Sequence, residues 1–211
     1  MNYSLLVIYS LLTLVISILI LLATFAANRI KAKVNFSLFI LSIFALALLA
    51  SFQVNTYPFS NIAIICFGVF GGSALASLLS KKAKTVAFLI IMLLLSALDI
   101  TSFATGPQTS GSIPDTVSIY INFVINIAKG DIYKVGSLDI LILSLGQAYL
   151  AFKGLSFKSV LIYSVVALQL PFLFVLLFNL SGGSPLIPFI SFFFALALIM
   201  HDNPRMFKKT F

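Results

Sequence analysis

The sequence has little charge: Asp, Glu, Lys and Arg together make up only 9% of its 211 residues, and it contains neither Glu nor Trp. A water-soluble domain carries roughly 25% charged residues, so a soluble globular protein is excluded. Cys66 is the one cysteine and His201 the one histidine, which is too few for an internal disulfide or a structural zinc site. The chain is instead 61% hydrophobic, with 22 Phe. It is expected to be an integral membrane protein without a cofactor.

Seven apolar runs are long enough to be membrane-spanning helices, because a bilayer core of about 30 Å needs roughly 20 apolar residues. This predicts an all-α multi-pass membrane protein with a single domain over residues 1–211. Within it, residues 1–84 are expected to form a three-span scaffold, 85–200 a four-helix region that holds the candidate site, and 201–211 a basic tail. The seven runs are residues 4–26, 35–53, 58–79, 85–106, 135–152, 157–179 and 184–200.

The basic residues predict the orientation in the membrane, because Lys and Arg near span ends favour the cytoplasmic side. Eleven of the thirteen basic residues follow spans 1, 3, 5 and 7, and the other two, Lys129 and Lys134, lie in the long loop 107–134. The N-terminus is therefore expected outside, the C-terminus in the cytoplasm, and the protein in the cell membrane. The excess of basic residues indicates topology and not nucleic-acid binding, since no polar domain carries them.

The long outer loop, residues 107–134, has a pattern of its own. From Asp115 to Ile127 apolar residues alternate with mostly polar ones, and a period of two is typical of an extended strand or a hairpin arm. Two interpretations stay open here: a lid that lies on the membrane surface, or a strand that pairs with another segment.

Two acids lie inside predicted spans, where ionisable groups are costly and usually functional. Asp99 precedes Gly106 by seven residues, which corresponds to about 10 Å of helix, and Asp139 follows Lys134 by five, or about 7 Å. Because spans 4 and 5 run in opposite directions, both acids are expected at similar depth below the outer surface. They are therefore candidates to face each other.

A facing pair of carboxylates suits aspartyl proteolysis, in which two Asp share one proton because both cannot easily ionise side by side. The ionised member takes a proton from the attacking water, and the protonated member donates to the developing oxyanion or the leaving nitrogen. The alternative from the residues alone is a structural role, with either Asp bonded to nearby Ser or Thr side chains.

Three motifs resemble the presenilin and signal peptide peptidase family of intramembrane aspartyl proteases. Leu98-Asp99 stands where the family has its first aspartate, and Gly106-Pro107 follows it. Gly136-Ser137-Leu138-Asp139 is similar to the family's Gly-x-Gly-Asp, with Leu138 in place of the second Gly. Pro185-Leu186-Ile187-Pro188 stands where a Pro-Ala-Leu motif begins the family's last helix. The resemblance covers residues 85–200, with three spans before it where the family has five.

The resemblance implies a function and a set of site residues. Asp99 and Asp139 would be catalytic, and the residues of the second and third motifs would support the site or bind substrate: Gly136, Ser137, Leu138, Pro185, Leu186, Ile187 and Pro188. The predicted orientation is that of signal peptide peptidases, which implies substrates that are single-span segments or signal peptides entering with the N-terminus inside. The strand predicted over 115–127 would then capture an extended substrate by main-chain pairing. Replacing Ile121 and Phe123 by proline should then slow cleavage strongly, which tests that role.

Other functions fit part of the pattern. A proton- or cation-coupled transporter also uses intramembrane acids and broken helix starts, although no second acid pair and no repeated half is evident in the sequence. A non-catalytic relative of the family or a purely structural membrane protein is a further alternative. Gly68 and Gly72 in span 3 have the small-xxx-small spacing that allows close helix packing.

Overall fold

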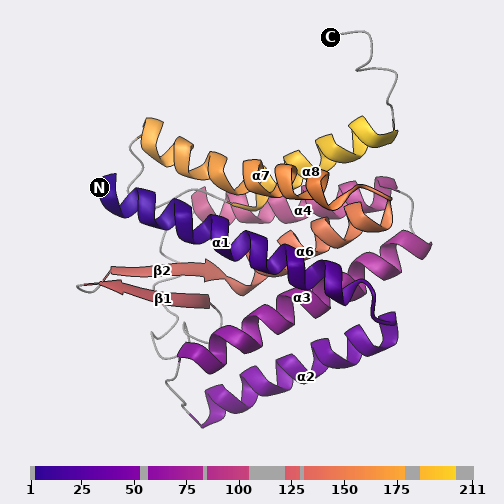
Figure 1. Ribbon diagram of the computed structural model, residues 1–211, viewed down its shortest axis with the longest axis horizontal. Coiled ribbons are helices and arrows are strands. Elements are labelled where there is room, and N and C mark those ends of the chain that lie inside the picture. The colour runs from indigo at the N-terminus through magenta and orange to yellow at the C-terminus, as the bar shows by residue number, and fades with distance from the viewer. Residues whose placement is uncertain are drawn as a thin grey trace.

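The apolar runs form helices close to the predicted bounds. The computed structural model describes residues 3–52, 57–82, 85–104, 122–128, 131–178 and 186–202 (Figure 1). Within these ranges the protein is helical apart from one two-stranded sheet. The helices are α1 (Tyr3–Ala27), α2 (Ala32–Ser51), α3 (Tyr57–Lys82), α4 (Thr85–Ala104), α6 (Ser137–Phe152), α7 (Phe157–Phe178) and α8 (Ile187–Asp202).

Three helices, α1, α2 and α3, are long and apolar enough to cross a membrane by length and composition. The described parts of the other four contain shorter apolar helices of 10–17 residues. The sequence therefore folds into the helices that its hydropathy predicts, while seven complete spans stay a prediction.

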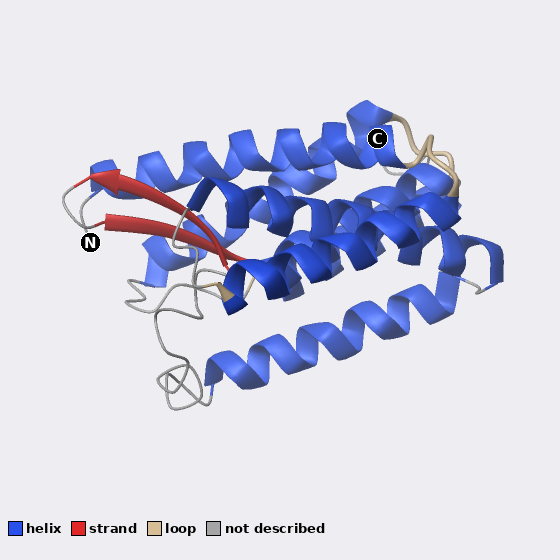
Figure 2. Ribbon diagram, turned by 90° about the horizontal axis from the view of Figure 1, so that it is seen from below, coloured by secondary structure: helices blue, strands red, loops and turns tan. Residues whose placement is uncertain are grey.

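Helix α6 is the centre of the bundle. Every residue from Ile140 to Leu150 is buried, because α3 packs along one side of the helix and α1, α7 and α8 contact the others. The ring of Phe194 on α8 lies directly over Gly146, where an added Cβ would overlap it at 1.8 Å. Helix α2 lies at the lower edge of the molecule in Figure 1 and packs mainly on α3, and it is nearest the viewer in Figure 2, which is seen from below. Asp139 thus lies in the first turn of a helix that packs against several others.

Gly68 and Gly72 allow α3 to approach α6 closely, which confirms the packing role predicted from their spacing. A Cβ added at Gly68 would lie 2.5 Å from the side chain of Ile140, and one at Gly72 would lie 2.6 Å from the backbone nitrogen of Leu145. Across the same crossing, Ser144 accepts a hydrogen bond from Thr24 of α1 at 3.3 Å. Small residues and a buried hydroxyl pair therefore fix three helices around one point.

Gly72→Ala is expected to destabilise the protein more than Gly71→Ala does. At Gly72 the new methyl group meets backbone atoms of α6, which cannot move without separating two helices, whereas at Gly71 it meets the ring of Phe39 at 2.7 Å. Overpacking of this kind costs about 1–3 kcal/mol. Thermal unfolding in detergent measures the difference, and equal losses at both positions would contradict the close α3–α6 contact.

A β-hairpin lies at the end of the molecule opposite the α1–α2 turn (Figure 1). Strand β1 (Asn122–Ala128) pairs antiparallel with β2 (Asp131–Gly136), in a register that sets Phe123 opposite Val135 and Ile125 opposite Tyr133. The strand predicted over 115–127 is thus present from residue 122 onward, and residues 115–121 lie outside the described ranges. It pairs with a partner strand, which favours that interpretation over a surface lid.

Strand β2 is a correction to the sequence prediction, which assigned Val135 and Gly136 to span 5. The helix begins two residues later, at Ser137, because Val135 is used in the sheet opposite Phe123. Val, Ile and Tyr are common in strands, but the charged Asp131 and Lys134 break the hydropathy of this short segment. The apolar Val135 therefore looks, from hydropathy alone, like the first residue of span 5.

Asn61 of α3 clamps β1 to the helices. Its side-chain amide donates to the carbonyl of Val124 at 2.7 Å and accepts from the backbone N–H of Val124 at 2.9 Å. The neighbouring Phe123 and Val124 side chains are buried. The base of the hairpin therefore has a fixed position relative to α3, and β2 leads directly into α6.

Candidate active site

Asp99 connects α4 to the start of α8. It lies five residues before the end of α4, and its Oδ2 atom accepts a hydrogen bond from the backbone N–H of Ile187 at 3.0 Å. The backbone of Leu186 also interacts with this carboxylate. Ile187 is the first residue of α8, so the carboxylate binds one of the N–H groups that a helix leaves unpaired at its N-terminus.

Asp139 is the third residue of α6 and caps that helix. Its Oδ2 atom accepts a hydrogen bond from the backbone N–H of Gly136, the N-cap residue, at 3.2 Å. This is the acidic half of a capping box, in which the side chain at the third helical position reaches back to the N-cap. The contact is close, since a Cβ added at Gly136 would lie 2.8 Å from the same Oδ2 atom.

The two carboxyl groups lie close enough for their charges to repel each other. The sequence predicted equal depth for Asp99 and Asp139, and the fold brings them into one site. Asp139 lies in the first turn of α6, and the Asp99 carboxylate contacts the first N–H of α8, so each carboxylate is close to a helix N-terminus, where the macrodipole favours negative charge. The helix N-termini therefore stabilise one ionised carboxylate, while charge repulsion disfavours ionisation of the second carboxyl group.

The residues of the second motif occupy the beginning of α6. Ser137 is partly exposed, and Leu138 is half exposed, with 50% of its surface accessible. The bulky side chain that stands in place of the family's Gly is therefore not buried between helices. It forms part of the surface next to the site.

The residues of the third motif form the beginning of α8. Leu186 packs partly against the core, and Ile187 is buried. Pro188 is the second residue of the helix, where the N–H that proline lacks would have no partner in the helix anyway. An ordinary first helical turn therefore accommodates Pro188. Pro185 lies outside the described residues.

Two supporting contacts were not found by sequence reasoning. Asn61 anchors the hairpin that precedes Asp139, and Ser191 of α8 donates to the carbonyl of Met92 on α4 at 3.2 Å. The signal for Asn61 was its position as a polar residue inside an apolar run. Ser191 carries no such signal, because Ser is common inside membrane helices and its partner is a carbonyl 99 residues away.

The described part of the chain contains no group of three or more His, Cys, Asp or Glu side chains that could hold a metal ion. In comparisons with known proteins, no protein-family model, no curated protein and no solved structure matches this chain. The functional argument therefore depends on the geometry around the two aspartates and on the motifs in the sequence.

Proposed function

We propose that this protein is an intramembrane aspartyl protease that hydrolyses peptide bonds of single-span membrane segments or signal peptides. The observation that carries the proposal is the meeting of Asp99, Asp139 and the N-terminus of α8 in one site. The same three segments carry the resemblance to presenilins and signal peptide peptidases. They lie far apart in the sequence, and their convergence is what a two-aspartate site requires.

The mechanism follows from the two environments. A carboxylate beside a second carboxyl group shares one proton with it, so one member acts as a base and the other as an acid. The base takes a proton from water as the water attacks the peptide carbonyl, and the acid donates a proton to the oxyanion or the leaving nitrogen. The helix N-terminal amides hold the carboxylate oxygens in place during both transfers.

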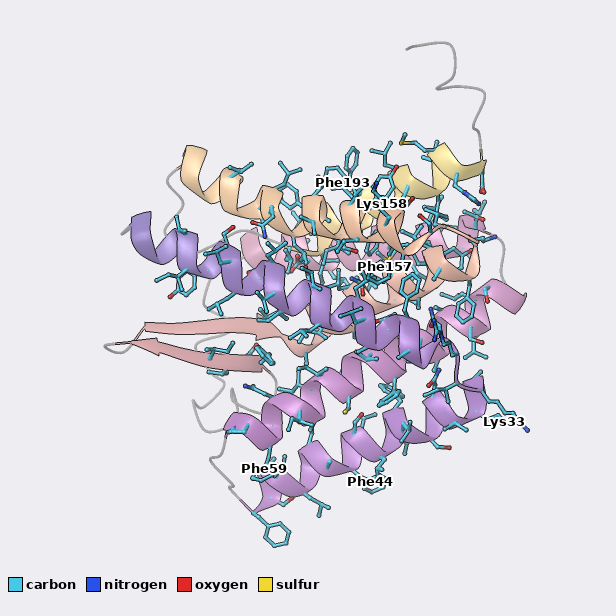
Figure 3. All side chains as sticks on the ribbon, in the orientation of Figure 1. Lys33, Phe44, Phe59, Phe157, Lys158 and Phe193 are labelled. Carbon is cyan, nitrogen blue, oxygen red and sulfur yellow. The ribbon has the colours of Figure 1, made fainter. Side chains whose placement is uncertain are left out.

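In the proposed topology the chain crosses the cell membrane seven times, with the N-terminus outside and the C-terminus in the cytoplasm. The distribution of basic residues supports it, since Lys33 lies at the end of the molecule opposite the hairpin (Figure 3), and Arg29 and Lys31 belong to the α1–α2 turn just before it. Helices α6 and α8 have 16 residues, or about 24 Å, whereas α1 and α3 have 25 and 26, or about 38 Å. If the cytoplasmic ends are level, α6 and α8 begin below the outer surface, at a depth where a substrate span can be cut.

The hairpin offers a docking edge for an extended substrate, on β2 and not on β1. Asn61 binds both backbone groups of Val124 on the outer side of β1, so this edge is occupied there. In an antiparallel pair, the backbone N–H and C=O groups of successive residues point alternately toward the partner strand and away from it. The backbone groups of Lys134, opposite Val124, therefore also point away from β1. Those of Gly136 do the same, and its N–H donates to Asp139. Among the described residues β2 pairs only with β1, so its outer edge is open there, and this edge leads to the Asp139 carboxylate.

Gly136→Ala is expected to lower the turnover number by about 10- to 100-fold with little change in stability. The new Cβ would displace the Asp139 carboxylate, which lies at the end of a rotatable side chain, without moving a helix. A displacement of about 1 Å in a catalytic group costs on the order of 100-fold. Turnover of a peptide substrate and thermal unfolding are measured together, with Gly71→Ala as the control. Unchanged turnover would show that the position of Asp139 beside Gly136 does not matter for catalysis.

The proposal is tested by cleavage of a single-span peptide in liposomes, with the N-terminus-in orientation, by the wild type and by Asn variants at Asp99 and Asp139. Loss of cleavage in both variants supports the protease. Cation or proton uptake that depends on Asp99, without cleavage, would support the transporter instead.

A further inference from the structure

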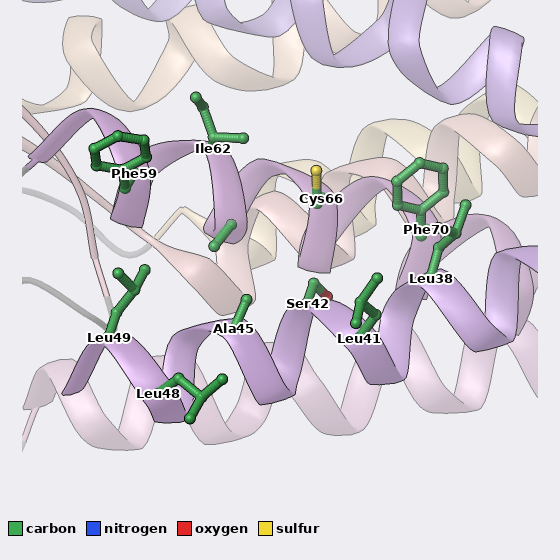
Figure 4. A pocket seen from close by; sticks show the side chains of 11 residues that line it. Leu38, Leu41, Ser42, Ala45, Leu48, Leu49, Phe59, Ile62, Cys66 and Phe70 are labelled. Carbon is green, nitrogen blue, oxygen red and sulfur yellow. The ribbon is translucent and has the colours of Figure 1, made fainter. Parts of the chain in front are cut away.

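An apolar groove runs between α2 and α3 (Figure 4), and no residue of the candidate active site lines it. It encloses about 470 Å³, within the range of small-molecule sites. Leu38 and Phe70 line one end, Leu49 and Phe59 the other, and small side chains such as Ala45 line the middle. The groove forms because α2 packs mainly on α3 and presents small residues toward it.

The groove has the dimensions of a lipid chain. From Leu38 to Leu49 it extends over eleven residues of α2, or about 16 Å, close to the thickness of one leaflet of the bilayer core, about 15 Å. It runs parallel to the helices, and its rim residues Leu41, Phe59 and Ile62 are each more than half exposed. A polar ligand would find few partners in it, since Ser42 and Cys66 are the only lining residues that carry a side-chain oxygen or sulfur.

Positive charge gathers at one end of this groove. Arg29, Lys31 and Lys33 fall within five residues at the α1–α2 turn, and all three are exposed. Lys31 lies seven residues before Leu38, which lines the near end of the groove, or about 10 Å along the axis of α2. It is the N-cap of α2, has an extended backbone and makes no side-chain capping bond, which leaves the positive end of the helix dipole available to an anion.

The same turn contains buried polar atoms that need partners. Both amide atoms of Asn28 and the Oδ1 atom of Asn35 have no hydrogen-bond partner among the described residues. The Nδ2 atom of Asn35 donates to the carbonyl of Ala27 at 2.9 Å, so this side chain is fixed across the turn. The turn beside the groove is therefore cationic and contains buried amide atoms without partners among the described residues.

We infer that an acidic phospholipid of the cytoplasmic leaflet binds here, with its phosphate at the Arg29–Lys33 turn and one acyl chain in the α2–α3 groove. Charge complementarity favours this occupant over a neutral lipid or a helix of another protein. Its acyl chain matches the length of the groove, and its phosphate matches the positive charge of the turn. The inference depends on membrane insertion with the basic end inside, and it is independent of the proteolytic activity.

The absence of Trp makes a direct test available, since one introduced Trp is the only indole in the chain. Leu41→Trp places it in the exposed rim of the groove, and Leu93→Trp places it on the exposed face of α4 as the control. Each variant is reconstituted in phosphatidylcholine vesicles that contain a small fraction of brominated phosphatidylglycerol or of brominated phosphatidylcholine, and quenching is measured.

Brominated phosphatidylglycerol is expected to bind next to Trp at position 41 at least about 5-fold more strongly than brominated phosphatidylcholine, with no preference at position 93. Arg29→Gln with Lys31→Gln should remove the preference while quenching by phosphatidylcholine persists. The comparison of the two lipids needs no charge variant, so it stands even if that variant inserts poorly. Equal quenching by both lipids at position 41, or no quenching by either because a second protein helix covers the groove, would overturn the inference.

Discussion

Asp99→Asn and Asp139→Asn are each expected to reduce cleavage by about 10²- to 10⁴-fold, the contribution that a positioned acid or base makes to a reaction. An amide cannot accept or release the shared proton, so either substitution removes one half of the pair. Because the two carboxyl groups act as a unit, the double variant should be no slower than either single variant. Single-turnover cleavage of a fluorescent single-span peptide in liposomes measures the loss.

The same substitutions are expected to leave the fold intact. The Asn side-chain oxygen can still accept the hydrogen bonds from Ile187 N–H and Gly136 N–H that the Asp oxygens accept. Asp202→Asn, on an exposed acid at the far end of α8, is the matched control and should cleave normally. Cleavage that survives in either Asp99→Asn or Asp139→Asn would exclude the two-aspartate mechanism.

Lys134→Pro is expected to slow cleavage by about 10-fold or more while the hairpin persists. The backbone N–H of Lys134 faces away from β1, because its partner Val124 directs its backbone groups to Asn61. Proline there removes a donor that a docked substrate would use, but it removes no bond between β1 and β2. Each main-chain hydrogen bond contributes about 0.5–1.5 kcal/mol, and the proline ring also blocks close approach of the substrate strand.

Lys134→Ala is the matched control, since it removes the side chain and keeps the N–H. It should cleave at nearly the wild-type rate. Phe123→Pro, in contrast, lies opposite Val135 inside the pairing and should disrupt the hairpin itself. If Lys134→Pro and Lys134→Ala are equally active, β2 is not the docking edge for substrate.

Much of the helical framework could be predicted because a single property, hydropathy, determines it. The predicted run 157–179 became α7 at Phe157–Phe178, and the run 85–106 became α4 at Thr85–Ala104. Close packing of α3 against another helix also followed from the sequence, since small residues such as Gly72 permit it, although the sequence did not identify α6 as the partner. In each case the signal lies within one segment.

The contacts between segments could not be predicted in the same way. Sequence depth placed Asp99 and Asp139 at one level, but it contained no sign that Asp99 would bind the first N–H of α8. That bond depends on the residue at which α8 begins, and with Pro185 and Pro188 on either side of Ile187 the sequence did not determine this residue. The clamp of Asn61 on Val124 and the pairing of β2 likewise join segments whose local patterns are short or interrupted by charge.

The measurement that tests the central claim most directly is mass spectrometry of a single-span peptide incubated with the wild-type protein in liposomes made in H₂¹⁸O. Hydrolysis by an activated water predicts two product masses, with ¹⁸O in the new C-terminal carboxyl group, and at least about 100-fold less of both products with Asp99→Asn or Asp139→Asn. An intact peptide across several substrates and pH values, with the protein folded, would contradict the proposed protease.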